Sequence, residues 1–518
     1  MTLAVLMACG MGSIHAQQAE STVWCGNPII HSHYSADPAP VVIGDTLYIY
    51  YDQDIGVTPS GSVYYYMNDW RVASSTDMVN WTDHGKALPL SKFKWANDGS
   101  AWASQCVERN GKYYWYVCAD YPGHWNAIGV AFSDTPTGPF RAVGTTPFIS
   151  TGKMGDIDPT VFIDDDGQAY LYWGNNKLCY VKLGKNMVSY DKTIGTNGVV
   201  EVTLTPEGFG GLKKDGKVEG ENCMEEGPWL MKREGIYYLL YAAGGVPENI
   251  AYSTSDSPTG PWTYRGKIMP VTNTASFTNH CGVVEFKGKW YFVYHTGWLN
   301  EGNGGGGFNR SIAIEELYFN ADGTIQQIAP TRKGVAAIGT LNPYQPVSAA
   351  TMNGSSMLTI LGDEKQGVYV SDLAVKDSIA VANVQFGETA PRSISLDVAS
   401  EVDGCKVLVR VDHAVRGTRM ALVDIPNTGS KTAFQTVTTD LQADVTGVHR
   451  VIFLFMGKSG ASFKRWRLNM EDTETLTPVG QVRAVVVDDD AYYTLDGIRH
   501  SHPVRGINLH QGKKIYQK

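Results

Sequence analysis

Three carboxylates occupy comparable places in three repeated segments of this 518-residue chain. Asp158 and Glu226 each stand nine residues before a turn glycine, and Asp37 stands seven residues before its own. Asp37 and Asp158 directly precede a proline, and Glu226 precedes Gly227-Pro228. One aspartate before a proline would more often be a turn or strand-end residue. Three acids in one register instead predict side chains that converge on one pocket.

The chemistry that such a cluster would serve is glycoside hydrolysis. One carboxylate activates water, and one carboxylic acid protonates the leaving oxygen on the other side of the scissile bond. A third carboxylate nearby keeps that acid protonated through like-charge repulsion and fixes its orientation. A non-catalytic alternative stays open at this point, in which the acids only hydrogen-bond to sugar hydroxyls.

Five segments of the chain share one order of features: a polar or acidic head, an apolar strand, a turn glycine and an aromatic strand. The turn glycines are Gly44, Gly111, Gly167, Gly235 and Gly288. A second hairpin pattern, such as Ser133-Asp-Thr-Pro-Thr-Gly-Pro-Phe140, falls between them. Four strands per repeat with little helical periodicity predict a five-bladed β-propeller over residues 23–335. The innermost strands line the central channel of a propeller, which would bring the three acids together.

The pattern changes after Leu341-Asn-Pro-Tyr344. Residues 345–475 alternate apolar and polar side chains in short strands separated by turn residues, which predicts an antiparallel β-sandwich of the jelly-roll type. Residues 476–518 form a separate short, β-like tail in this interpretation. The whole chain is therefore expected to be all-β.

The first 17 residues have the features of an export signal, an apolar run from Leu3 to Met11 followed by Ser13-Ile-His-Ala16. We expect residues 1–17 to be the signal peptide of a secreted or periplasmic protein, with lipoprotein processing at Cys9 as the alternative. No later run reaches the roughly 18 apolar residues of a spanning helix, so no membrane span is expected. The net charge of −9 argues against a nucleic-acid partner.

The first domain resembles glycoside hydrolase family 43, of the arabinofuranosidase and β-xylosidase type. The matching residues are Asn27-Pro28, Ala36-Asp37-Pro38, Ser74 to Trp81, Trp102-Ala103, Ile157-Asp158-Pro159, Glu226-Gly227-Pro228 and Asn279-His280. The resemblance implies an inverting mechanism with Asp37 as the general base and Glu226 as the general acid. It implies that Asp158 modulates the pKa of that acid and orients it.

Five further residues are candidates for contact with a sugar or a metal ion. Trp102 is the first candidate for a sugar-stacking ring, and Trp70 and Trp229 are weaker ones that core packing would equally explain. In the family resemblance, Arg310 matches an arginine that contacts the sugar in the cleavage subsite. His280 heads the fifth inner strand and would help to hold a calcium ion or a water cluster on the propeller axis, unless it is a core histidine. No organic cofactor is expected.

Residues 345–475 resemble a family 6 carbohydrate-binding module in segments such as Gly367 to Val370 and Phe463 to Trp466. Phe434 stands where that family usually has a stacking tryptophan, and Lys464-Arg465 replaces its usual asparagine-containing ending. We therefore expect this domain to bind sugar weakly or not at all.

Together these features predict an exo-acting, inverting hydrolase that releases L-arabinofuranose from arabinoxylan or arabinan. A β-xylosidase of the same family is the close alternative, because the two sugars present similar hydroxyl geometry to one pocket. Loss of any one acid would favour the non-catalytic sugar-binding alternative, and all three are present. The expected partner is a plant cell-wall polysaccharide or oligosaccharide, and the protein is expected to be a monomer.

Overall fold

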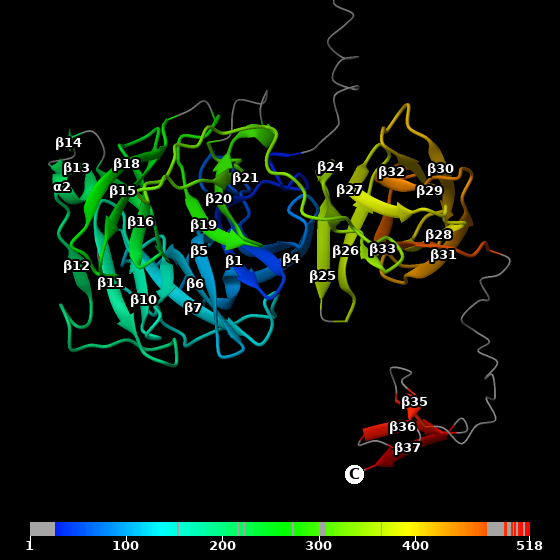
Figure 1. Ribbon diagram of the computed structural model, residues 1–518, viewed down its shortest axis with the longest axis horizontal. Helices are drawn as coiled ribbons and strands as arrows, with labels where there is room; N and C mark the ends of the chain where they lie inside the picture. The colour runs from blue at the N-terminus through cyan, green and yellow to red at the C-terminus, as the bar shows by residue number, and fades with distance from the viewer. Residues whose placement is uncertain are drawn as a thin grey trace, which may run out of the picture. The chain divides into compact units, whose positions relative to one another are not determined.

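The computed structural model describes residues 26–152, 155–214, 217–220, 223–271, 274–300, 307–363 and 365–473, and five short stretches between 492 and 517. The chain is all-β and falls into two compact units, Met1–Asn469 and Met470–Lys518 (Figure 1). The expected signal peptide (residues 1–17) and Cys9 lie outside the described residues. The helices among those residues are all too short or too polar to cross a membrane.

Five antiparallel sheets follow one another along the first 317 residues. Their strands, sheet by sheet, are β1 (Ala36–Ile43), β2 (Thr46–Asp52), β3 (Asp69–Ser75) and β4 (Trp81–Pro89); β5 (Trp102–Arg109), β6 (Lys112–Asp120), β7 (Asn126–Ser133) and β8 (Arg141–Ala142); β9 (Thr160–Ile163), β10 (Ala169–Trp173), β11 (Leu178–Leu183) and β12 (Val200–Val202); β15 (Met224–Arg233), β16 (Ile236–Ala243), β17 (Asn249–Ser255) and β18 (Thr263–Met269); and β19 (Cys281–Phe286), β20 (Lys289–Thr296) and β21 (Ser311–Leu317). Short elements lie between them: η1 (Leu90–Lys92), α2 (Pro206–Phe209), η2 (Trp298–Asn300) and the hairpin of β13 (Gly211–Lys214) and β14 (Lys217–Gly220).

The first strand of each sheet touches the first strand of the next. β1 contacts β5, β5 contacts β9, β9 contacts β15, β15 contacts β19, and β19 contacts β1 again. The starting ends of these five strands therefore lie close together, although they belong to separate sheets. This is the arrangement that positions the functional site.

Aromatic side chains of the second strands fill the space between neighbouring sheets. Tyr50 of β2 meets Trp115 of β6 edge to face, with ring centroids 4.8 Å apart. The Tyr50 hydroxyl donates to the carbonyl of Pro136 in the next sheet, and the Tyr172 hydroxyl of β10 donates to the carbonyl of Pro258 in the same way. The sequence pattern of aromatic strands and Thr-Gly-Pro hairpins therefore serves inter-sheet packing.

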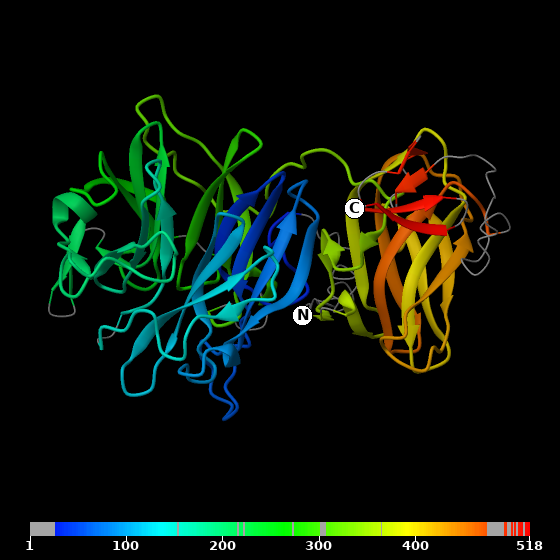
Figure 2. The same ribbon diagram turned by 90° about the horizontal axis from the view of Figure 1, so that it is seen from below.

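The region after Tyr344 forms two facing sheets, drawn in yellow and orange in Figure 2. One has the order β25 (Thr359–Asp363), β26 (Gly367–Leu373), β33 (Ala461–Asn469), β28 (Ser393–Ser400) and β31 (Gln435–Asp440), with β22 (Val347–Ser348) beside β33. The other has the order β24 (Gly354–Ser355), β27 (Ser378–Gly387), β32 (Gly447–Gly457), β29 (Cys405–Val411) and β30 (Arg419–Ile425). Between them lies a core that includes Phe453, Phe463 and Trp466.

This sandwich is joined to the first sheet by main-chain hydrogen bonding. β23 (Thr351–Met352) pairs with β4 and adds a fifth strand to that sheet. The Asn80 side chain both donates to and accepts from the backbone of Ala382, and Asn353 donates to the carbonyl of Val79. The second unit contains a small sheet of β34 (Tyr492–Thr494), β35 (Arg499–His500), β36 (Gly506–His510) and β37 (Lys513–Gln517).

Candidate active site

A pocket of about 230 Å³ opens where the first strands of the five sheets begin. Six of the residues singled out in the sequence line it: Asp37, Trp102, Asp158, Glu226, His280 and Arg310. Asn279, which belongs to the matching Asn279-His280 pair, also lines the pocket, together with Tyr64, Tyr65 and Asn126, which no sequence motif indicated.

The backbone at the carboxylates has an unusual conformation. Asp37 and Asp158 have φ values of 49° and 58°, and each directly precedes a proline. Left-handed φ values are uncommon for residues other than glycine, and where they persist the surrounding structure holds them in place. In β15 this position is taken by Gly227, with φ of 60°. Asp37 is the second residue of β1, Glu226 is the third residue of β15, and Asp158 stands two residues before β9, so the acids lie at or near the starting ends of their strands.

The three acids do not occupy equivalent positions in their strands, contrary to what the spacing in the sequence predicts. In β1 a bulge follows Ala36, and in β15 the same bulge follows Glu226. Glu226 therefore corresponds to Ala36, and Gly227 corresponds to Asp37. The distance from the bulge to the turn glycine is one residue longer in β15 than in β1. Counting back from the turn glycine therefore places Glu226 one residue away from its true equivalent in β1. Glu226 still reaches the same pocket from the earlier position.

Asp37 lies beside one arginine and two histidines. Arg310 Nη1 donates to Asp37 Oδ1 over 2.9 Å. The Asp37 backbone N–H donates to His295 Nδ1, which also lies 3.3 Å from Asp37 Oδ1. Burial by itself would raise the pKa of Asp37, but Arg310, His295 and His280 together hold it well below its usual value. The carboxyl group of Asp37 is thus ionised at neutral pH, as a general base requires.

The other two acids have the opposite tendency. Burial raises the pKa of Glu226 to about 7, against the lowering effect of a 2.6 Å hydrogen bond from Asn175 Nδ2. Burial and the charges of Glu226 and Asp37 raise the pKa of Asp158 well above its usual value, although the Gly227 N–H donates to it over 2.9 Å. Glu226 and Asp158 therefore form a pair that retains a proton near neutral pH.

Arg310 is itself fixed by an acid that the sequence did not indicate. Its Nε and Nη2 donate to the two oxygens of Asp54, each over 3.0 Å, and its backbone N–H donates to Asp54 Oδ2 over 2.7 Å. The guanidinium also lies over the Tyr65 ring, 5.1 Å from its centroid. This bidentate clamp aims the remaining Nη1 at Asp37.

Of the three tryptophans considered for sugar stacking, only Trp102 lines the pocket. Trp70 is completely buried in the hydrophobic core, where its Nε1 donates to the Trp102 carbonyl, and Trp229 is buried in the same core. The candidacy of Trp70 and Trp229 is therefore wrong, because a ring enclosed by protein presents no face to a sugar. Both faces of these strands are buried. The alternation of apolar and polar residues along the sequence therefore could not distinguish a tryptophan in the core from one in the pocket.

The residues around His280 do not fit the expected calcium site. Calcium takes about 6–8 oxygen ligands, whereas His280 offers one nitrogen. The Asp37 oxygen 3.9 Å from His280 Nδ1 already accepts from Arg310. The described part of the chain contains no group of three His, Cys, Asp or Glu side chains that could hold a metal ion. Burial lowers the pKa of His280 to about 4, so the imidazole is neutral at the pocket wall.

Exposed apolar side chains collect around the pocket mouth. Among the described residues before 335, eight of the nine exposed large hydrophobic side chains lie in loops at the end of the sheets that carries the acids: Ile55, Val57, Val63, Tyr64, Trp125, Val246, Val271 and Phe277. Trp125 is 62% exposed, has φ of 64° and directly precedes the pocket residue Asn126. The end of the sheets that carries the acids is therefore more apolar on its surface than the opposite end.

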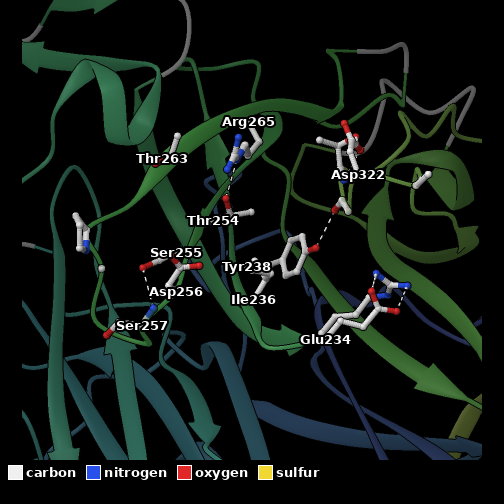
Figure 3. A pocket seen from close by; sticks show the side chains of 16 residues that line it. Glu234, Ile236, Tyr238, Thr254, Ser255, Asp256, Ser257, Thr263, Arg265 and Asp322 are labelled. Carbon is white, nitrogen blue, oxygen red and sulfur yellow. Dashed lines mark hydrogen bonds and ion pairs between the residues drawn. The ribbon is translucent and has the colours of Figure 1, made fainter.

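A larger cavity of about 660 Å³ lies at the other end of the β15–β18 sheet, shown in Figure 3. Tyr238 donates there to the carbonyl of Gly323, and Arg265 donates to Thr254. Its three acids, Glu234, Asp256 and Asp322, are all exposed, and Glu234 is paired with Arg233. This cavity is larger, but the described residues that line it include no set of buried acids with pKa values shifted in opposite directions. The smaller pocket contains such a set and is therefore the candidate active site.

The candidate sugar site of the sandwich is partly covered. Phe434 packs edge to face against Tyr369 with centroids 5.3 Å apart, and the Lys464 ammonium lies 5.3 Å from the Phe434 centroid. Arg465 is paired with Asp397. Side chains of the protein itself therefore pack against the Phe434 ring, where a sugar would otherwise stack.

Comparison with known proteins agrees with this geometry. The model of glycosyl hydrolases family 43 matches residues 25–325, and that of the carbohydrate binding module (family 6) matches residues 347–472. The first match spans more than half of the chain, so the protein belongs to glycosyl hydrolase family 43 and is a glycosidase.

Two relatives are similar to different lengths of the chain. An arabinoxylan arabinofuranohydrolase of Bacillus subtilis (strain 168) is 33% identical, over 88% of this chain and 94% of that protein. A xylosidase/arabinosidase of Bacteroides ovatus is 32% identical over 57% of this chain and 95% of that protein.

Two solved structures are also similar. One is a family 43 arabinoxylan arabinofuranohydrolase from Bacillus subtilis in complex with cellotetraose, with a TM-score of 0.73 and 29% identity over 88% of this chain and 99% of that one. The other is a calcium-free β-xylosidase/α-arabinofuranosidase from a compost metagenome in complex with xylotriose, with a TM-score of 0.50 and 32% identity over 58% of this chain and 97% of that one.

Proposed function

We propose that the protein is an exo-acting, inverting α-L-arabinofuranosidase that removes arabinose side groups from arabinoxylan. The observation that carries this is the divided protonation of three acids in one pocket. Asp37, ionised beside Arg310, activates water, and Glu226, with a pKa of about 7, protonates the leaving oxygen. Asp158 shares the proton of Glu226 and orients it.

We also propose that the five sheets are the blades of a β-propeller. The sequential contacts of β1, β5, β9, β15 and β19, which return from β19 to β1, support this arrangement. In it the three acids would lie at one mouth of the central channel.

The size of the pocket and the composition of its rim support a polymeric substrate attacked at a single terminal sugar. At about 230 Å³ the pocket is smaller than the roughly 300–1,000 Å³ typical of drug-sized ligands. It would take one pentose while Trp125 and Tyr64 on the rim contact the polysaccharide chain. The names of the Bacillus subtilis relatives favour arabinoxylan as that chain. β-Xylosidase activity is the second candidate, supported by the relatives named for both sugars.

The stereochemistry of hydrolysis tests the mechanism. If Asp37 and Glu226 act on opposite faces of the sugar, their carboxyl groups are about 6.5–9.5 Å apart in the complex and the first product has the inverted configuration. Proton NMR during hydrolysis of an aryl arabinofuranoside and an aryl xyloside reports the anomer and the preferred sugar. A retained anomer as the first product would exclude Asp37 as a base.

The leaving group separates the two roles. Glu226→Ala should retain most activity on substrates with acidic leaving groups, which need little protonation, whereas Asp37→Ala should lose about 10²–10⁴-fold on every substrate. Glu234→Gln at the larger cavity is the matched control and should behave as wild type. Equal losses for the two variants across leaving groups would contradict this division of labour.

We further propose export of the protein through residues 1–17 and a monomeric state. Mass spectrometry of the mature N-terminus in the natural host tests the first proposal, and distinguishes cleavage after residue 16 or 17 from lipidation at Cys9. Light scattering of the purified protein tests the second.

A further inference from the structure

Asp52, the last residue of β2, is a completely buried acid beside the proposed base. It lies opposite Ala36 in the strand pairing, one residue before Asp37. Neither of its carboxyl oxygens accepts a hydrogen bond from any donor of the described residues. After burial, the charge of Asp37 is the strongest influence on the Asp52 carboxyl group, and it disfavours the ionised form of Asp52 by raising its pKa. Two ionised carboxylates buried in one site repel each other, which favours a proton on one of the pair.

The charges around the pair decide which acid keeps it. The titratable and charged groups that interact with Asp52 or Asp37 are Arg310, Asp54, Asp158, Glu226, Tyr65, Cys118, His280 and His295. Arg310 is the one permanent cation of this set, and it spends two donors on Asp54 and one on Asp37. Asp52 receives none of them. Burial and the nearby charge of Asp37 raise the pKa of Asp52 well above its usual value, whereas that of Asp37 is held low.

We propose that Asp52 is a positioning residue that stays a neutral carboxylic acid and donates a hydrogen bond to the carboxylate of Asp37. The base is then held from two sides, by the Arg310 guanidinium and by the Asp52 hydroxyl, on a backbone already in a left-handed conformation. This inference rests on the proposed role of Asp37 and adds an orienting group that touches no sugar. No net charge is added, because the donor is neutral.

Two variants of Asp52 separate donation from mere space filling. Asp52→Asn keeps an N–H donor toward Asp37 and cannot ionise, whereas Asp52→Leu has a similar shape and no donor. A hydrogen bond to the ionised form lowers a pKa, so its loss should raise the pKa of Asp37. In Asp52→Leu we expect the acid limb of the kcat/KM profile to move up by about one pH unit and kcat to fall about 10–100-fold. Asp52→Asn should keep the wild-type acid limb and recover most of kcat.

The control is Asp83→Asn, a buried acid that also has a raised pKa but lies away from the pocket. It is expected to change stability and leave the acid limb in place. A wild-type limb in Asp52→Leu, or an equal shift in Asp52→Asn and Asp52→Leu, would overturn the proposal. If Asp37→Asn retains full activity, the proposed function fails first, and the two failures are thereby distinguished.

Infrared difference spectroscopy of the folded wild type keeps the proposal testable even where Asp52→Leu does not fold. A protonated carboxyl band present at pH 7 and lost in Asp52→Asn is the expected result. A wild-type spectrum in which no such band depends on Asp52 would show that this acid is ionised, and the inference would be wrong.

Discussion

At Glu226, burial and one hydrogen bond act on the same carboxyl group in opposite directions. Burial disfavours the ionised form and raises the pKa, while Asn175 stabilises that form and lowers it. The balance leaves Glu226 half-protonated at about pH 7. Asn175 thus sets the alkaline limit of the general acid without touching the scissile bond.

Replacing Asn175 by alanine tests this balance. Without the hydrogen bond the pKa of Glu226 rises above about 7, so the general acid stays protonated to higher pH. The alkaline limb of the kcat/KM profile should therefore move to higher pH, by about 0.5–1 unit. Asn320→Ala, in the exposed loop near the larger cavity, is the matched control and should leave the limb unchanged. Movement of the limb to lower pH in Asn175→Ala would refute the assignment.

At the scale of the elements, two buried tyrosine hydroxyls each tie one sheet to a hairpin of the next. Tyr50 reaches Pro136 and Tyr172 reaches Pro258, each over 2.6 Å. Both rings are completely buried, so no water replaces the bond when the hydroxyl is removed. The carbonyl left behind would lose its partner, which costs more than the bond itself contributed.

Tyr50→Phe and Tyr172→Phe should each lower the free energy of unfolding by about 1–2 kcal/mol. Urea denaturation followed by tryptophan fluorescence measures the change. Tyr318→Phe, at an exposed hydroxyl, is the control and should stay within about 0.5 kcal/mol of wild type. If Tyr318→Phe lowered the free energy of unfolding as much as the two buried variants, the hydrogen bonds between sheets could not be the cause of the loss.

A second element-scale prediction concerns the sandwich. The Lys464 ammonium lies against the Phe434 ring, which we expect to keep soluble-xylan binding by this domain weak. Lys464→Ala should uncover the ring and strengthen retardation in xylan-containing gels. Lys458→Ala on a nearby turn serves as the control for lost charge. Strong retardation of the Asp37→Asn variant, whose active pocket is disabled and whose Lys464 is intact, would contradict the expectation.

At the scale of the whole molecule, the sandwich and the first sheet share a continuous hydrogen-bonded structure. β23 extends the β1–β4 sheet, and Asn80 and Asn353 satisfy backbone groups across the junction. Sandwich and sheets should consequently unfold together in one calorimetric transition.

Removing the two asparagines tests that coupling. The double variant Asn80→Ala/Asn353→Ala leaves buried backbone groups unpaired, and each costs about 1–3 kcal/mol. Its calorimetric trace should broaden or split into two transitions, whereas Asn427→Ala in an exposed sandwich loop should keep one. A single, unshifted transition in the double variant would show that the junction adds no coupling.

The sequence by itself determined the repeats, the all-β class and the three acids, because these are encoded locally in turn glycines, aromatic strands and Asp-Pro pairs. The tertiary structure decided which residues surround the acids. Arg310 meets Asp54 across 256 residues of chain, and Asn175 and Asp52 sit on loop and strand positions without a motif. It also separated Trp102 from Trp70, since strands buried on both faces give core and pocket rings the same sequence pattern.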